Sequence, residues 1–255
     1  MIKFFRKIRY DLMEKNKTGK PALPADGPAR PVGRYFKYAI GEIVLVVIGI
    51  LIALQINNWN EQRKVDGEIL KTLTEIRSNL ISDSLGIRET RILKAEDINI
   101  QYRVINELES RNIPYDSIEH HLGRVMLARR IVLVDNGYQL MKKFGLELLK
   151  NQELRNELIN YYTNSTKKIK DDTDDDEFEF RTVFLPYVRN HFLDFEWSKQ
   201  GVPSDYEYLM SDQYFLTSLK ANIKNQESTL EALKNGAKKI QEILPMLDKT
   251  VLAYE

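Results

Sequence analysis

The sequence predicts an all-α protein with one N-terminal transmembrane helix followed by an extracytoplasmic helical bundle. Three observations lead to this prediction. One stretch of 19 residues, Tyr38 to Ile56, contains a single charged residue and a single amide. After residue 60, apolar residues recur at spacings of three and four along much of the chain. No alternating apolar and polar pattern bounded by turn residues recurs, so a sheet is not expected.

Residues 1–17 are expected to form a basic amphipathic helix at the membrane interface. One side of such a helix carries apolar residues together with Arg9, and its other faces carry Lys3, Arg6 and Lys7. A short helix of this kind beside a membrane span lies in the headgroup plane, because anionic lipid attracts it. Phe4 and Phe5 are its expected contacts with the interface. A disordered basic tail is the alternative that the composition leaves open.

Residues 18–34 are predicted to be a linker. Residues 18–33, TGKPALPADGPARPVG, contain four prolines and three glycines in sixteen positions. No regular element survives such a density of helix-breaking residues. A linker of this composition does not fix the geometry between the interfacial helix and the span.

The transmembrane helix is expected over residues 35–59. Its apolar part would be about 28 Å long as a helix, close to the hydrocarbon thickness of about 30 Å. Tyr35 and Tyr38 precede this part and Trp59 follows it, as aromatic residues do at the two membrane interfaces. Only a helix lets a single exposed segment satisfy its own backbone in lipid. The length and flanks argue against a buried core helix, and the lack of a small-residue cleavage pattern after Ile56 argues against a signal peptide.

The distribution of charge predicts the orientation. Residues 1–37 carry ten basic and three acidic residues, a net charge of +7, whereas the chain from residue 57 onward has a net charge of −5. The positive-inside rule then places the N-terminus in the cytoplasm and residues 60–255 outside it. Over the whole chain, 38 basic and 37 acidic residues nearly cancel, which argues against a nucleic-acid-binding surface.

Residues 60–255 are predicted to form an α-helical domain. One apolar stripe runs from Ile69 to Leu80, and the most regular stripe runs from Tyr214 to Leu244. Because only Gly67 weakens a helix between the span and the first stripe, the span is expected to continue outward as a stalk. Further helices are expected over residues 98–108, 118–134, 146–169 and 178–195, the last interrupted at a proline. Together they predict a bundle of about five to seven helices with coiled-coil-like packing.

Few residues are candidates for chemistry. The chain has no cysteine, which excludes disulfides, Cys-type zinc sites and thiol nucleophiles, and only three histidines. His120 and His121 are adjacent, so on a helix they point apart and do not easily share a metal ion. No hydrolase, zinc-protease, P-loop or dinucleotide motif is present. We therefore expect no catalytic, cofactor-binding or metal site, no small-molecule substrate and no enzymatic activity.

A run of six acidic residues lies within Asp171–Glu177, and calcium binding there is the alternative that the composition leaves open. Read as an EF-hand loop from Asp172, the run lacks the glycine at position six and has Val183 in place of the bidentate glutamate. A solvated loop between helices is the expected structure.

Glu42 is the one charged residue of the predicted apolar stretch. On a helix, Gly49 and Ala53 point within about 40° of the direction of Glu42. Small residues allow two helices to approach closely, and polar groups pair there rather than face lipid. We expect Glu42, Gly49 and Ala53 to form a helix–helix seam with a second copy or another membrane protein. The alternative is that Glu42 reaches back to the cytoplasmic headgroups.

Three stretches carry a resemblance to known sequences: MIKFFRKIR at 1–9, YAIGEIVLVVIGILIALQINNWNE at 38–61 and NGYQLMKKFGLELLKNQELRNELINYY at 136–162. They resemble a large bacterial family of small single-span inner-membrane proteins, frequent in Bacteroidetes-type genomes and classed as a domain of unknown function. The proline-rich linker departs from this family, which joins its two N-terminal pieces more tightly. The resemblance implies an inner-membrane protein with a cytoplasmic N-terminus and a periplasmic C-terminal domain, and it implies no reaction.

Two function classes follow from these features. The first is a membrane-anchored, non-enzymatic interaction or scaffold protein. Its partners are membrane lipid and a second copy or another membrane protein, and no nucleic acid is expected. The second is a single-span subunit of a proton-driven energy-coupling complex that uses Glu42, since the layout resembles the partners in biopolymer-transport and Tol systems. In those partners the acid is aspartate and the outer domain is not an all-helical bundle, so the first class is preferred.

Overall fold

The computed structural model describes residues 32–111 and 115–254, and for residues 32–38 and 115–117 it describes the backbone alone. The interfacial helix predicted for residues 1–17, with Phe4 and Phe5, lies outside the described residues. The chain divides into two compact units: the first ends at Trp59, and the second begins at Asn60.

Helix α2 (Val32–Ser110) begins within the range predicted as linker and runs without a break into the second unit. The sequence explains this length, because no proline occurs between Pro31 and Pro114. An 18-residue window of α2 has a mean hydropathy of 2.6, and none of it is buried. Among the described residues, α2 is the helix long and apolar enough to cross a membrane. The predicted fold class, all-α with one candidate span, is confirmed.

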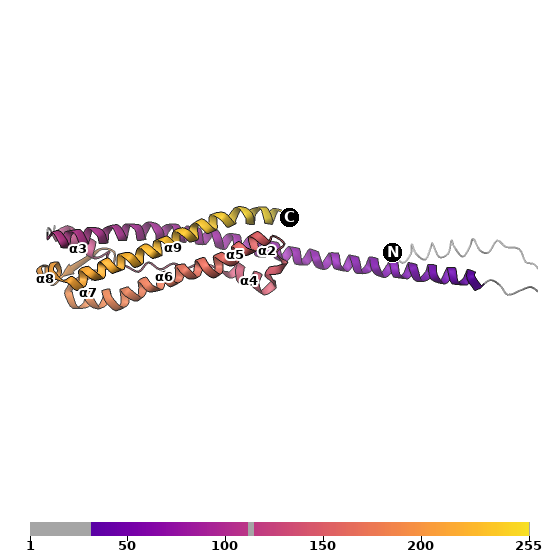
Figure 1. The fold of residues 1–255 in the computed structure, drawn as a ribbon, viewed down its shortest axis with the longest axis horizontal. Coiled ribbons are helices and arrows are strands. Elements are labelled where there is room, and N and C mark those ends of the chain that lie inside the picture. Colours follow the sequence, from indigo (N-terminus) through magenta and orange to yellow (C-terminus); the bar gives the residue numbers. More distant parts are fainter. Residues whose placement is uncertain (1–31, 112–114, 255) are drawn as a thin grey trace, which may run out of the picture. The chain divides into compact units, whose positions relative to one another are not determined.

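The second unit is built on three long helical segments (Figure 1). One is the part of α2 that follows Asn60, and another is α9 (Gln213–Leu252). The third is a continuous run of α-helix with two π-helical turns: α5 (Gln152–Asn160), η2 (Tyr161–Ser165), α6 (Thr166–Glu179), η3 (Phe180–Phe184) and α7 (Leu185–His191).

Contacts between distant residues give the directions of these segments. Asp83 of α2 bonds to Tyr161, and Lys94, further along α2, bonds to Asp176, so α2 and the α5–α7 run are parallel. Gln101 of α2 bonds to Gln226, whereas Arg77 pairs with Asp248, so α9 runs antiparallel to α2.

Shorter elements connect the long segments. They are α3 (Tyr115–Leu122), α4 (Asn136–Phe144), the 3-10 turn η1 (Leu146–Leu148), the strands β1 (Phe192–Glu196) and β2 (Gln200–Pro203), and α8 (Tyr206–Ser211). β1 and β2 pair antiparallel as a hairpin, with Glu196 opposite Gln200 and an irregularity between Phe192 and Asp194. This hairpin was not predicted, because each strand is too short for alternation to show in the sequence.

Two predicted helices end differently in the structure. The helix predicted over 118–134 is wrong beyond Leu122, where the chain leaves α3 and continues without helix to residue 135. The helix predicted over 98–108 is part of α2. Gly86 is the one helix-weakening residue between this stripe and the stripe from Ile69 to Leu80, and a single glycine does not break a long packed helix.

The predicted helices over 146–169 and 178–195 are also corrected. The first is non-helical at residues 149–151, and α5 begins at Gln152, where the Asn151 side chain caps the Leu154 N–H. The second ends at His191 because residues 192–196 form β1. Pro186 does not end the helix, since it lies in the first turn of α7 directly after the π-helical turn η3, where a missing N–H is tolerated.

Two hydrophobic clusters form the core of the second unit. One joins α2 from Ile69 to Ile87 with α4, α5, α6 and the C-terminal half of α9. The other joins α2 from Ile98 to Leu108 with α3, α7 and the N-terminal third of α9. Polar side chains occupy the interior between the two clusters, and they shape the candidate site.

Candidate functional site

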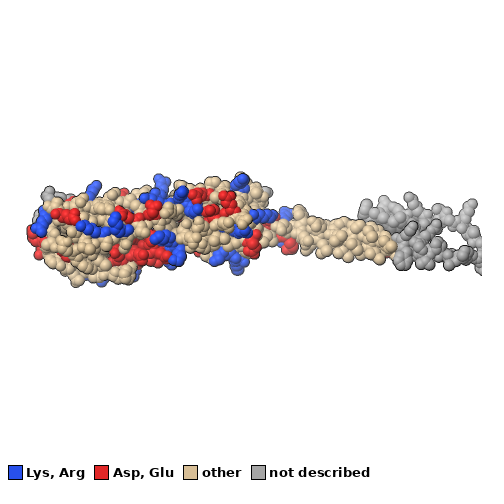
Figure 2. All heavy atoms as spheres, viewed as in Figure 1, with Lys and Arg blue, Asp and Glu red and all other residues tan. Residues whose placement is uncertain are grey.

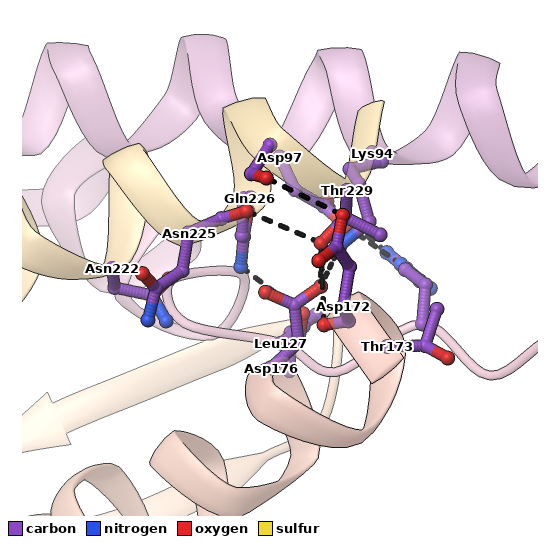
Figure 3. Close-up of polar contacts among 12 residues, drawn as sticks. Lys94, Asp97, Leu127, Asp172, Thr173, Asp176, Asn222, Asn225, Gln226 and Thr229 are labelled. Carbon is purple, nitrogen blue, oxygen red and sulfur yellow. Dashed lines mark hydrogen bonds and ion pairs between the residues drawn. The ribbon is translucent and has the colours of Figure 1, made fainter. Parts of the chain in front are cut away.

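A buried polar layer separates the two hydrophobic clusters, and α2, α6 and α9 all contribute to it (Figure 3). We define the polar layer as Lys94, Asp97, Gln101, Asp172, Asp176, Gln226 and Thr229. All seven side chains are almost completely shielded from solvent. Buried groups of this kind destabilise a fold unless each finds a partner, so their contacts define the geometry here.

An ion pair between α2 and α6 lies at the centre of the polar layer. Lys94 Nζ donates to Asp176 Oδ2 at 2.6 Å, and the two side chains are 0% and 1% exposed. The Thr229 hydroxyl donates to the same oxygen at 2.8 Å. The other carboxylate oxygen of Asp176 has no partner among the described residues. The position of Lys94 is therefore fixed by one acceptor, and the charge of Asp176 is balanced by one cation.

Asp97 binds the chain that follows α3. Arg129 donates Nε to Asp97 Oδ2 at 2.6 Å and Nη2 to Oδ1 at 3.1 Å, which makes a two-bond contact. Arg124 donates to Asp97 Oδ1 at 2.8 Å and also to Glu96. A carboxylate that is 1% exposed thus holds two guanidinium groups, and both belong to the same stretch of chain.

Two amides extend this attachment to α9. The Gln101 side chain donates to Gln226 Oε1 at 3.0 Å, and Gln226 Nε2 donates to the Leu127 carbonyl at 3.2 Å. The chain after α3 is therefore held from both sides of the bundle by side chains rather than by strand pairing.

A second set of contacts holds the same chain nearer to residue 135. Asp83 Oδ1 accepts the Val134 N–H at 2.8 Å, and its Oδ2 accepts the Tyr161 hydroxyl at 2.7 Å. Asn79 accepts the Gly137 N–H at 2.9 Å. Burial raises the pKa of Asp83 above its ordinary value, against the effect of the bonds from Tyr161 and Val134. Burial and the neighbouring carboxylate also raise the pKa of Tyr161.

These contacts determine the conformation of residues 127–135, here called the extended segment. Arg129 contacts Asp97 and Val134 contacts Asp83, and these two α2 residues lie about 21 Å apart along the helix axis. Five residues cover at most about 17 Å when fully extended, and the long Arg129 side chain supplies the remainder. The segment must therefore be close to full extension as it returns along α2.

Side chains alternate along the extended segment. Arg129, Ile131 and Leu133 point toward the bundle, since the first binds Asp97 and the other two pack on the hydrophobic core. Val132 points outward and is 84% exposed. This period of two is that of a β-strand.

The extended segment has no strand partner. Within the described part of the chain, no backbone N–H or C=O of residues 128–133 makes a hydrogen bond to another residue. The nearest bonded backbone groups are the Leu127 carbonyl and the Val134 N–H. Backbone polar groups require hydrogen-bond partners, so the N–H and C=O groups of residues 128–133 are available to solvent or to another chain.

A groove with a volume of about 530 Å³ separates the extended segment from α6. Its walls are residues 130–135 on one side and, on the other, Tyr162, Thr166, Lys167, Ile169, Lys170, Thr173, Asp174 and Glu177. A second hollow of about 610 Å³ adjoins it and shares Arg130 and Glu177. These two residues form an ion pair at 2.6 Å, and the Arg130 guanidinium lowers the pKa of the Glu177 carboxyl.

The groove presents backbone hydrogen-bonding groups and apolar side chains. Among the described residues there is no group of three or more His, Asp or Glu side chains that could hold a metal ion. His121 contacts Glu107 at 3.4 Å, and the ring of His191 stacks on Tyr208. Neither histidine lines the groove. What the groove offers is a row of unpaired backbone donors and acceptors beside an apolar wall.

The residues predicted from the sequence are placed as follows. Glu42, Gly49 and Ala53 are exposed on the part of α2 before Asn60, and a side chain added at Gly49 would meet no atom within 4 Å. Trp59 is exposed at the end of this part. Tyr35 and Tyr38 belong to α2, but their side chains lie outside the described residues.

The loop predicted over the acidic run is wrong. Residues 171–177 lie within α6, and Asp172 and Asp176, one helical turn apart, point into the bundle. Asp172 accepts Lys168 Nζ at 2.6 Å, and Asp176 accepts Lys94. A helix is favourable here because the two acids that point into the bundle have cationic partners. The exposed acids of the run lie on the solvent-facing side of α6.

Sequence reasoning also missed the polar layer and the extended segment. A signal for the first was present, because Lys94, Asp97 and Gln101 continue the spacing of the apolar stripe of α2 with polar residues. For the segment, four consecutive aliphatic residues from Ile131 fit a buried helix and a strand equally well.

Asp83 makes the stability of the second unit depend on pH. Because its pKa is raised in the folded state, its favourable contribution is complete below its ordinary pKa of 3.8 and is lost as the pH rises through the folded value. The free energy of unfolding of the wild type, relative to that of Asp83→Asn, should therefore fall as the pH rises above 3.8. Urea denaturation of both proteins in detergent over a pH series measures this difference. Asp175→Asn, an exposed acid of α6, controls for the loss of one negative charge. A difference that does not change with pH contradicts the prediction.

Comparison with known proteins identifies one region. Residues 42–136 match the model of a family described as a family of unknown function, DUF6090. The match begins at Glu42 and ends directly after the extended segment, so it includes one wall of the groove. The chain is similar to this family over that range. No curated protein and no solved structure shows significant similarity to the chain.

Proposed function

We propose that this chain is a membrane-anchored, non-enzymatic interaction protein. The observation that carries the proposal is the apolar window of α2, of which no part is buried, in a helix that continues into the second unit. Figure 2 supports it, because charged side chains are spread among uncharged ones over the visible face of the second unit and are nearly absent from the described part of the first. So much uncovered apolar surface is unfavourable in water, and a bilayer covers it.

The proposed location is a bacterial inner membrane. The +7 charge of residues 1–37 supports a cytoplasmic N-terminus, and the net charge of −5 after the span supports a periplasmic second unit. The match over residues 42–136 is to a family of unknown function, so it adds no activity to the proposal.

The proposed partner within the membrane is a second copy of this chain or another membrane protein. Glu42, Gly49 and Ala53 share one face of α2, and no atom of the described chain covers Gly49. A helix that packs on this face lets Glu42 hydrogen-bond instead of facing lipid, and it gains close contact at Gly49.

Single cysteines at positions 49 and 53 test this seam, because the chain has no cysteine of its own. Oxidative crosslinking in native membranes should give a dimer or a product with a partner at both positions. A cysteine at position 51, in place of the exposed Leu51 on the opposite face, is the matched control and should crosslink weakly. Adding Gly49→Leu to the cysteine at 53 should abolish the product, since the larger side chain separates the helices. No product at either 49 or 53 contradicts the seam. An impermeant thiol reagent on a single cysteine at Ser211 reports the side of the membrane.

Glu42→Gln separates the two function classes. In an interaction protein the amide still pairs, so crosslinking and any growth phenotype should remain as in the wild type. In a proton-driven subunit the variant should assemble and yet lose function, because the titratable site is gone. The observation that favours the proton-driven subunit as a second candidate is that Glu42 is exposed on an otherwise apolar helix surface.

A further inference from the structure

We propose that the groove between the extended segment and α6 binds a neutral, extended peptide, which pairs as a β-strand with residues 129, 131 and 133. This inference rests on the proposed function, because it names the class of partner that the second unit binds. Its basis is the unpaired backbone of residues 128–133 beside a groove of about 530 Å³. Addition of a strand to an unpaired edge is a recurrent way for proteins to bind peptides.

The hydrogen bonds at the two ends of the extended segment identify which backbone groups face the groove. In a strand, the N–H and C=O of one residue point to the same edge, and those of the next residue point to the opposite edge. The Val134 N–H points toward α2, because Asp83 accepts it. Even-numbered residues therefore present their backbone to α2, and residues 129, 131 and 133 present theirs to α6.

The walls of the groove define the occupant. Leu133, Tyr162 and Ile169 provide apolar surface, which favours small apolar or β-branched side chains on one face of the peptide. The rim carries three cations and three anions, so it selects neither sign of charge. They are Arg130, Lys167, Lys170, Asp135, Asp174 and Glu177. A stretch of about five residues pairs with 129–133 over about 17 Å.

A second copy of the extended segment does not fit this role. Its inward side chains pack on the core and bind Asp97, and its groove-side edge faces its own α6 across the groove. Two copies cannot bring these recessed edges together without leaving their bundles. A separate peptide has neither restriction.

The test uses the full chain in detergent micelles and a terminally blocked peptide of about seven alternating threonines and valines. Amide hydrogen exchange is followed at single-residue resolution with and without the peptide. We expect slower exchange at 129, 131 and 133 and unchanged exchange at 128, 130 and 132. The same peptide with N-methylated internal amides lacks the donors and should protect none of them. Equal protection of both sets, or no protection at 129, 131 and 133, overturns the inference.

A pair of variants tests whether the peptide binds in the groove. Thr173→Trp fills the groove from α6 and should weaken peptide binding at least about tenfold, which corresponds to about 1.4 kcal/mol. Thr182→Trp is the matched control, because Thr182 is exposed outside the groove and makes the same hydroxyl bond to the carbonyl four residues earlier. It should bind as the wild type does. Fluorescence anisotropy of a labelled peptide measures both affinities, and thermal unfolding verifies that both variants fold. Wild-type affinity in Thr173→Trp overturns the inference.

The two proposals fail in different experiments. A chain that crosslinks at 49 and 53 in membranes but does not protect residues 129, 131 and 133 loses only the peptide site. A chain that binds the peptide in detergent but gives no crosslinks loses only the membrane seam.

Discussion

Lys94→Met is expected to lower the free energy of unfolding of the second unit by about 3–5 kcal/mol. The substitution leaves the Asp176 carboxylate buried without a cation, and its remaining bond, from the Thr229 hydroxyl, does not neutralise it. The loss of one partner from a buried ion pair is more harmful than the loss of both, because the charge that remains stays desolvated. Urea denaturation followed by circular dichroism, with the full chain in detergent, measures the change.

Two further variants make this result interpretable. Lys94→Met combined with Asp176→Leu removes both charges, and Thr229 keeps its bond to the Asn225 carbonyl, so most of the lost stability should return. Lys234→Met removes an exposed lysine whose partner Glu231 is 3.6 Å away, and it should change stability by less than about 0.5 kcal/mol. If the double variant is as unstable as Lys94→Met alone, lost packing and not the isolated charge explains the effect.

Gly123→Ala is the second substitution with a large expected effect, about 3 kcal/mol of destabilisation. Gly123 follows α3 and is buried against the hairpin, where an added Cβ would lie 2.3 Å from the Gln200 nitrogen and 2.7 Å from the Lys199 carbonyl carbon. These are backbone atoms, so the hairpin must move as a unit. The Ser198 N–H that bonds to the Gly123 carbonyl at 2.8 Å would be displaced with it.

The matched control is Gly86→Ala. Gly86 lies within α2, and a Cβ added there meets no atom within 4 Å. Alanine is the better helix former by up to about 1 kcal/mol, so this variant should be neutral or more stable. Thermal unfolding of both variants measures the contrast. Equal melting temperatures for Gly123→Ala and the wild type would mean that the hairpin does not pack against Gly123 as described.

The long helices could be predicted from the sequence because their apolar stripes are regular. The stripe from Ile69 to Leu80 lies in α2, and that from Tyr214 to Leu244 lies in α9. These stripes are repeated over many turns, so tertiary contacts reinforce the local preference and do not override it.

The groove could not be predicted, because its parts depend on contacts between distant residues. The extended segment is not helical since Asp97 and Asp83, on α2, hold it at nearly full extension. The acidic run is helical since Lys94, 82 residues before Asp176, neutralises one of its buried acids. A single sequence shows the charges and the aliphatic run, but it does not show which of them meet.

The parallel direction of α2 and the α5–α7 run has a consequence for folding. Contacts of α2 join residues far apart in sequence: 82 residues separate Lys94 from Asp176, 125 separate Gln101 from Gln226, and 171 separate Arg77 from Asp248. Asp176 and Thr229, which join α6 to α9, are only 53 residues apart. Because loop closure becomes less favourable with length, by about 0.6 kcal/mol for each doubling, pairing α6 with α9 has a smaller loop-closure cost than pairing either helix with α2. During synthesis the N-terminal span emerges first, so the face of α2 that packs on α9 remains uncovered until almost the whole chain has left the ribosome.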